Sequence, residues 1–100
     1  MRSYFYGERP KFYITWQDEN GVAYDPNTVN FMIARVGGMS ASYTAGIDPE
    51  ITNPSTGVYE IYFSLIEEGK WTYRWEAKNA AAVFLDARER VFLVRDGYFY

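Results

Sequence analysis

Apolar residues recur at every second position in this chain, and this pattern limits most strongly what it can fold into. Segment 70–78 is the clearest case: Trp71, Tyr73, Trp75 and Ala77 alternate with polar neighbours. Successive side chains of an extended chain point to opposite faces, so this period predicts half-buried strands, whereas a helix needs a period of 3.6. The 10 Tyr, 7 Phe and 3 Trp residues support strands, because aromatic rings suit a pleated surface.

The same alternation predicts further strands along the chain. They cover segments 11–17, 28–36, 39–44, 57–65 and 83–95, with a short edge strand near Ile51 in the long connection 45–55. One face of these strands is predicted to carry Phe12, Ile14, Trp16, Val29, Phe31, Ile33, Tyr59, Ile61, Phe63 and Leu65. About seven strands separated by Gly, Pro and Asn turns are typical of an all-β sandwich or barrel. We expect a single domain over residues 1–100, because a chain of this length supports one core.

One connection between two of these strands has a specific pattern. Leu65 ends a strand, Gly69 turns the chain, and Tyr73 lies in the strand that returns. This order resembles the tyrosine corner of immunoglobulin and fibronectin type III sandwiches, in which a Tyr hydroxyl bonds the backbone of the corner before it. On this interpretation Tyr73 closes the corner, while Trp71 and Trp75 fill the space between the sheets. The alternative, that Tyr73 is a core ring with its hydroxyl at the rim, stays open.

A series of short motifs extends this resemblance over residues 7–95. The motifs are Asp18-Glu19-Asn20-Gly21, Asp25-Pro26-Asn27-Thr28-Val29, Thr56-Gly57-Val58-Tyr59, Gly69-Lys70-Trp71-Thr72-Tyr73-Arg74-Trp75 and Phe92-Leu93-Val94. Their order resembles that of the short immunoglobulin-like virion proteins of tailed bacteriophages. The resemblance implies an immunoglobulin-like (fibronectin III-like) antiparallel β-sandwich of about seven strands. Segment 37–50 departs from the pattern, so strand order in residues 37–55 stays open.

The resemblance also implies a function. It implies a non-catalytic structural role in the virion, as capsid decoration, a neck component or a tail accessory domain, with other virion proteins or further copies of this chain as partners. Such a protein is made in the host cytoplasm. We expect neither a signal peptide nor a transmembrane segment, because the start of the chain lacks an apolar stretch and no apolar run approaches the roughly 20 residues that span a bilayer.

The charge of the chain argues against polyanionic partners. The net charge is −3, and the 10 Lys and Arg residues are scattered rather than clustered. Nucleic acids and anionic membrane surfaces both select clustered basic residues. We therefore expect no nucleic-acid or membrane partner.

The residue types also restrict the chemistry. The chain has no His and no Cys, which excludes Ser-His-Asp and Cys-His catalysis and conventional zinc sites. Glu60 and Glu76 are the carboxylate pair to consider for glycoside hydrolysis, if their strands are neighbours, although a solvated charge ladder is the favoured interpretation. Oxygen ligands for calcium are available at Asp18, Glu19, Asn20 and Asp25, but turns favour Asp and Asn in any case. We expect no enzyme, no cofactor and no metal.

Aromatic triplets near both ends are the candidate partner interface. The six residues are Tyr4, Phe5, Tyr6, Tyr98, Phe99 and Tyr100. Exposed apolar patches mark contact sites, so we expect one or both ends to dock on a neighbouring chain, for example by adding a strand to a sheet edge. The alternative, that the ends fold back onto their own domain, stays open. Tyr13 and Tyr62 point outward, which leaves a carbohydrate- or receptor-binding module, with a surface glycan as ligand, as the alternative function.

Overall fold

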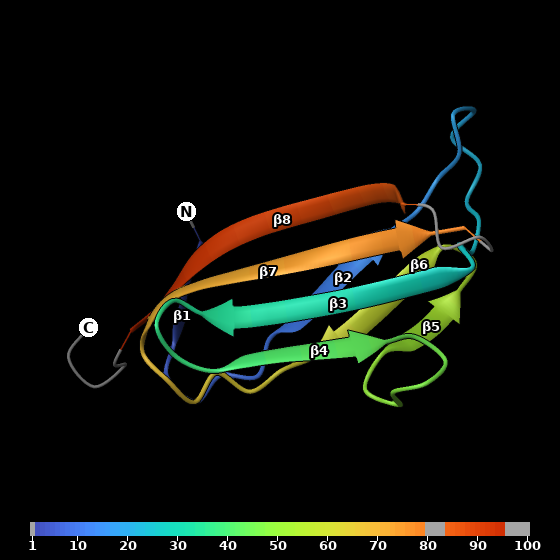
Figure 1. Cartoon of the computed structure of the whole chain (residues 1–100). Helices are drawn as coiled ribbons and strands as arrows, with labels where there is room; N and C mark the ends of the chain where they lie inside the picture. The colour runs from blue at the N-terminus through green and yellow to red at the C-terminus, as the bar shows by residue number, and fades with distance from the viewer. Residues whose placement is uncertain (1, 80–83, 96–100) are drawn as a thin grey trace.

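The computed structural model describes residues 2–79 and 84–95, and within them the chain forms eight strands in two layered sheets and no helix (Figure 1). The strands are β1 (Arg2–Phe5), β2 (Lys11–Thr15), β3 (Thr28–Arg35), β4 (Ser40–Thr44), β5 (Thr52–Ser55), β6 (Val58–Tyr62), β7 (Gly69–Lys78) and β8 (Phe84–Arg95). The predicted all-β, sandwich-like architecture is confirmed.

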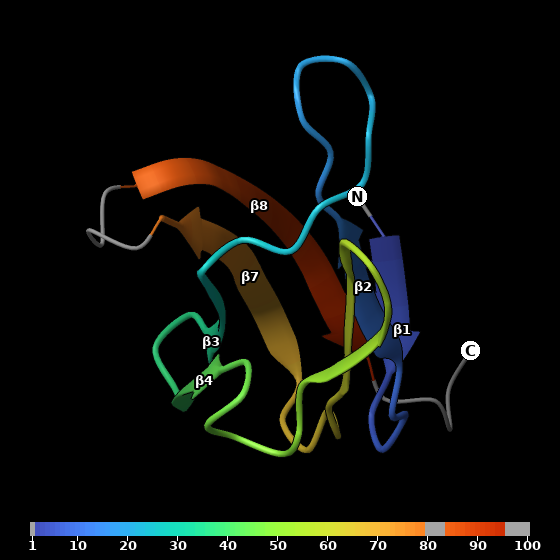
Figure 2. The same ribbon diagram turned by 90° about the vertical axis from the view of Figure 1, so that its right-hand side faces the viewer.

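The two sheets differ in size and in strand direction. One sheet has five strands in the order β1-β8-β7-β3-β4, and the other has three in the order β2-β6-β5. All pairs are antiparallel except β1 and β8, which run parallel. Figure 2 shows how strongly the larger sheet curls around the smaller one. The prediction of a purely antiparallel sandwich is therefore wrong for one pair.

Strand β1 was not among the predicted strands. It is four residues long, and Arg2 to Phe5 pair in register with Phe92 to Arg95 at the far end of the sequence. Four residues are too few to show a period of two, and the partner strand is distant in sequence. No local sequence pattern therefore predicts β1. The aromatic start of the chain thus folds back onto its own domain.

The core lies between the sheets and is built from the predicted faces. Every residue that the alternation assigned to the inward face of segments 11–17, 28–36 and 57–65 is buried, as are Trp71, Trp75 and Ala77. Tyr73 is half-buried and packs against this core. The Phe12 ring lies within 4.7 Å of the Tyr73 ring and 5.6 Å of the Phe31 and Phe92 rings, centroid to centroid. Such ring pairs contribute about 0.5–1.5 kcal/mol each beyond the burial of their area.

The segment whose strand order the sequence left open crosses between the sheets. Strand β4 forms a hairpin with β3 in the larger sheet, and β5 pairs with β6 in the smaller one. Residues 45–51 make the crossing, within the connection 45–55 that the sequence predicted, and Pro54 lies in the edge strand β5. Ile51 is buried and anchors the crossing, and β5 begins directly after it.

Gly57, in the turn between β5 and β6, fixes the position of the 17–25 loop. Its φ is +78°, and an added Cβ would lie 2.7 Å from the carbonyl oxygen of Trp16. The Gly57 carbonyl accepts a hydrogen bond from the Trp16 N–H (2.8 Å), and the Gly57 N–H donates to Asp25 Oδ1 (2.7 Å). Both the left-handed backbone and the close approach require glycine here.

We predict that Gly57→Ala destabilises the fold more than Gly46→Ala does. Both glycines have a φ near +80°, but a Cβ at Gly46 meets nothing within 4 Å. Each substitution adds the left-handed penalty of about 1–2 kcal/mol, and only Gly57→Ala adds the overlap with the Trp16 carbonyl, worth about 1–3 kcal/mol. Urea unfolding of the two variants measures the difference, and equal losses would contradict this role of Gly57.

Candidate binding surface

The N-terminal aromatic triplet is divided between the core and the surface. Tyr4 is half-buried, and its ring packs edge-on against Phe92 (5.2 Å) and Phe12 (6.2 Å). Phe5 and Tyr6 are 45% and 54% exposed. Tyr4 therefore packs against this chain's own core, and Phe5 and Tyr6 are the exposed residues of the triplet.

Phe5 and Tyr6 lie at one end of the sandwich, beside a connection with another exposed apolar residue. The Gly7 N–H donates to the Leu65 carbonyl (2.8 Å), which brings Tyr6 beside the connection that carries Ile66, itself 56% exposed. We call Phe5, Tyr6 and Ile66 the apolar end. Strand β8 also finishes here, because Arg95 pairs with Phe5. Tyr98, Phe99 and Tyr100 lie outside the described residues.

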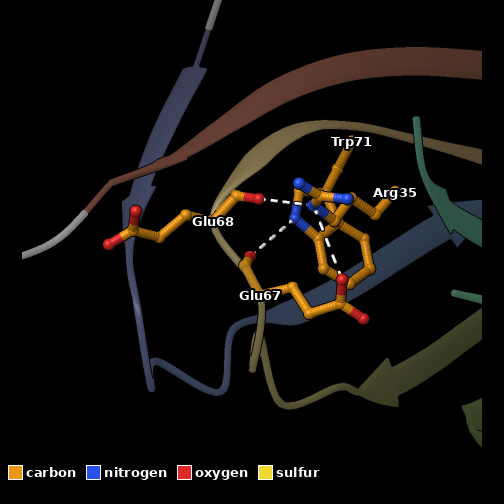
Figure 3. Close-up of polar contacts among 4 residues, drawn as sticks. All are labelled: Arg35, Glu67, Glu68 and Trp71. Atoms are coloured by element: carbon orange, nitrogen blue, oxygen red, sulfur yellow. Dashed lines mark hydrogen bonds and ion pairs between the residues drawn. The ribbon is translucent and has the colours of Figure 1, made fainter. Parts of the chain in front are cut away.

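The connection between β6 and β7, at the same end, is held by Trp71 and Arg35 (Figure 3). The Trp71 indole N–H donates to the Glu67 carbonyl (3.0 Å), and the Arg35 Nε–H donates to the Glu68 carbonyl and lies 3.5 Å from Glu67 Oε2. Gly69, with a φ of +125°, leaves room for Arg35, because a Cβ there would lie 3.1 Å from Arg35 Nε.

The residues predicted for this corner are thus brought together, with one residue that the sequence reasoning missed. Leu65, Trp71 and Trp75 are buried, and the Tyr73 ring faces inward between Phe12, Phe31 and Phe92. The corner role of the Tyr73 hydroxyl stays a prediction. The missed residue is Arg35, which the alternation shows only as a polar position, without indicating its contacts with Glu67 and Glu68.

The carboxylate pair considered for hydrolysis is not a pair. Glu60 lies on β6 and Glu76 on β7, which belong to different sheets. Each flanks buried residues of its own strand, so the two carboxylates point away from the core on opposite sides of the sandwich. Glu60 Oε2 lies 3.2 Å from Lys11 Nζ, and Glu76 Oε2 lies 3.0 Å from Arg74 Nε. The premise that their strands are neighbours is wrong.

The acidic loop residues serve as turn and loop anchors. Asp18 Oδ1 accepts the N–H groups of Asn20 (2.8 Å) and Val22 (3.0 Å), and Asp25 Oδ1 accepts that of Gly57. Within residues 2–79 and 84–95, no three His, Cys, Asp or Glu side chains gather closely enough to hold a metal ion.

The outer face of the smaller sheet carries two exposed tyrosines. Tyr13 is 65% and Tyr62 is 52% exposed, and they occupy diagonal positions, since Tyr13 pairs with Glu60 and Tyr62 with Lys11. Lys11 Nζ lies 5.6 Å from the centre of the Tyr13 ring. Its hydrogen bond to Glu60 raises the pKa of Lys11, so this ammonium stays charged beside the two rings.

Comparison with protein families, with curated proteins and with solved structures found no match. The structure itself contains no long apolar helix of the kind that crosses a bilayer within the residues that it describes.

The buried Tyr59 predicts a stability loss in alkali. Burial, together with the nearby Asp25 carboxylate, raises the pKa of Tyr59 from 10.0 to about 12. The folded chain thus holds this proton more tightly than the unfolded chain. The resulting stabilisation is complete below about pH 10 and is lost as the pH rises through about 12. Urea unfolding between about pH 8 and about pH 11.5 measures the loss.

The matched variant is Tyr59→Phe, which lacks the titrating hydroxyl. We expect its free energy of unfolding to fall less steeply than that of the unmodified chain over the same pH range. Parallel pH profiles for the two chains would contradict the assignment.

Proposed function

We propose that this chain is a non-catalytic, immunoglobulin-like assembly domain that makes protein–protein contacts through its apolar end. The observation that carries the proposal is the exposure of Phe5, Tyr6 and Ile66 together at one end of the sandwich. Large apolar side chains grouped on a surface are typical of contact sites, and aromatic rings are enriched in the cores of interfaces.

The strand order supports the immunoglobulin-like part of the proposal. In immunoglobulin domains strands B, E and D lie in one sheet and C, F and G in the other, with C′ added in variable domains. If β2 to β8 are lettered B, C, C′, D, E, F and G, the smaller sheet has the order B-E-D and the larger contains G-F-C-C′. Strand β1 then corresponds to A, although it pairs with G rather than with B.

The virion as the setting of this assembly is supported by the sequence resemblance. The motifs from Asp18-Glu19-Asn20-Gly21 to Phe92-Leu93-Val94 resemble the short immunoglobulin-like virion proteins of tailed bacteriophages. In such a setting the partners are copies of this chain or other virion proteins, and the domain acts through protein–protein contacts without catalysis. The division of Glu60 and Glu76 between two sheets agrees with a non-catalytic role.

A carbohydrate- or receptor-binding module is the second candidate, favoured by Tyr13 and Tyr62 on the outer face of the smaller sheet. A glycan array with the intact chain and with Tyr13→Ala tests it. Binding that Tyr13→Ala abolishes would support the module, and an array without signal would contradict it.

We predict that the intact chain self-associates in solution and that Phe5→Ser/Tyr6→Ser weakens this association about tenfold, because the exposed rings lose their apolar contact area. We expect deletion of residues 96–100, which include the C-terminal aromatic triplet, to weaken the association as well. Light scattering at several concentrations measures the molar mass of each chain.

The matched control is Ile47→Ser. Ile47 is 79% exposed and lies in the connection after β4, away from the apolar end. The Ile47→Ser substitution should leave the molar mass of the oligomer unchanged. An intact chain that stays monomeric at about 0.1 mM, or an oligomer that survives the double substitution, would contradict self-association through this surface.

A further inference from the structure

One side of the sandwich has two strand edges without a partner strand among the described residues. Strand β1 pairs with β8 only from Phe92 to Arg95, so the outer edge of β8 is uncovered over its earlier part. Strand β2 is the edge strand of the smaller sheet, paired with β6 on one side only. In Figure 2, β8 approaches β1 and β2 near its end and curves away from them toward its start.

The backbone of β2 directs hydrogen-bonding groups to this open side. The Pro10 carbonyl accepts a hydrogen bond from the Phe63 N–H (3.2 Å), and the Trp16 N–H donates to the Gly57 carbonyl (2.8 Å). Antiparallel ladders alternate, so the even-numbered residues of β2 bond β6, and the odd-numbered ones direct their N–H and C=O groups outward. The outward groups belong to Lys11, Tyr13 and Thr15. An uncovered row of this kind is a template for another strand.

A groove runs between these two edges. It has a volume of about 370 Å³, and its lining combines the edge of β2 with Tyr73 and Trp75 of β7 and Arg88 and Arg90 of β8. The Trp75 indole nitrogen is buried and without a hydrogen-bond partner in the described part of the chain. The groove is therefore a cleft with an aromatic floor rather than a flat edge.

The inward face of β8 changes character where β1 ends. Phe92 and Val94 are buried, and Arg88 and Arg90 share their side of the strand because the residue numbers differ by even steps. Arg88 lies over the Trp16 ring, 5.9 Å from its centre. Where β1 pairs with β8, this face of β8 carries apolar residues that pack into the core. Where no described strand pairs with that edge, the same face carries cations that line the groove.

The charge of the lining indicates what fits. Lys11, Arg88 and Arg90 contribute cations to the groove, and no Asp or Glu is among its lining residues. Lys11 is paired with Glu60 outside the groove, and the side chains of Arg88 and Arg90 line the groove itself. An occupant with carboxylates along its length complements this lining, and an occupant rich in Lys or Arg is repelled.

We propose that the groove between β2 and β8 accepts an extended, acidic segment of a partner protein, which adds as a strand to the free edge of β2. Lys11, Tyr13 and Thr15 supply the backbone hydrogen bonds, and Arg88 and Arg90 bind carboxylates of the incoming strand. Such strand addition takes affinity from main-chain hydrogen bonds and specificity from side chains at alternate positions. This site is separate from the apolar end, so either one can fail without the other.

The test uses fluorescence anisotropy with two labelled octapeptides, one alternating Val and Glu and the other alternating Val and Lys. We expect the intact chain to bind the acidic peptide at least about tenfold more tightly than the basic one. Equal binding of both, or binding of neither at about 1 mM peptide, would overturn the proposal. Arg88 and Arg90 would then be charged residues that prevent another strand from pairing with an open sheet edge.

Two variant pairs locate the peptide. Tyr13→Pro removes an outward N–H without breaking a bond to β6, and should weaken binding about tenfold. Tyr13→Ala keeps the N–H and should change binding less. Arg90→Glu should also weaken binding, whereas Lys70→Glu, on the outer face of the larger sheet, should not. Binding that Tyr13→Pro and Arg90→Glu leave unchanged would overturn the proposal.

Thermal melts of all four variants report whether they fold, and only variants that fold are compared. The intact chain could also form a dimer that Tyr13→Pro dissociates but the acidic peptide does not. In that case a second copy of the chain occupies the groove, and the assignment to an acidic partner is overturned.

Discussion

The Phe12 ring is the contact on which the arrangement of the two sheets depends. It projects from the smaller sheet, and its centroid lies within 6.2 Å of the rings of Tyr4, Phe31, Tyr73 and Phe92. Those four rings come from β1, β3, β7 and β8, so one side chain joins the smaller sheet to four of the five strands of the larger one. The same contact holds Tyr4, and with it β1, against the end of β8. The apolar end and the open groove lie on either side of this point.

Alternation in the sequence was enough to predict the inward faces of β2, β3, β6 and β7, because a period of two is a local property of a strand. It did not reveal β1, whose four residues pair in parallel with a partner about ninety positions away. That pairing depends on the packing of Tyr4 against Phe92 and Phe12, which exists only once the two sheets have met. Tertiary contacts of this kind override local preference in short edge strands.

The candidate sites were predictable to different degrees. Phe5 and Tyr6 are exposed, as the sequence predicted, but Tyr4 is half-buried and packs against the core because β1 turns it inward. Glu60 and Glu76 were separated by the assignment of their strands to different sheets, which the sequence pattern does not specify. The positions of Arg88 and Arg90 on β8 could have been predicted, because they are separated from Phe92 and Val94 by even numbers of residues and so lie on the same face of the strand. Arg35 left none, because its partners lie in a distant connection.

Backbone amide exchange in β2, followed by NMR on the isolated chain at low concentration, tests the account most directly. An open outer edge predicts alternation: the amides of Phe12 and Ile14, which bond β6, exchange at least about 100-fold more slowly than those of Lys11, Tyr13 and Thr15. The three outward amides should then become protected when the acidic peptide is added. Equal protection of all five amides in the isolated chain would mean that the edge is already covered, and would contradict an open edge that receives a partner strand.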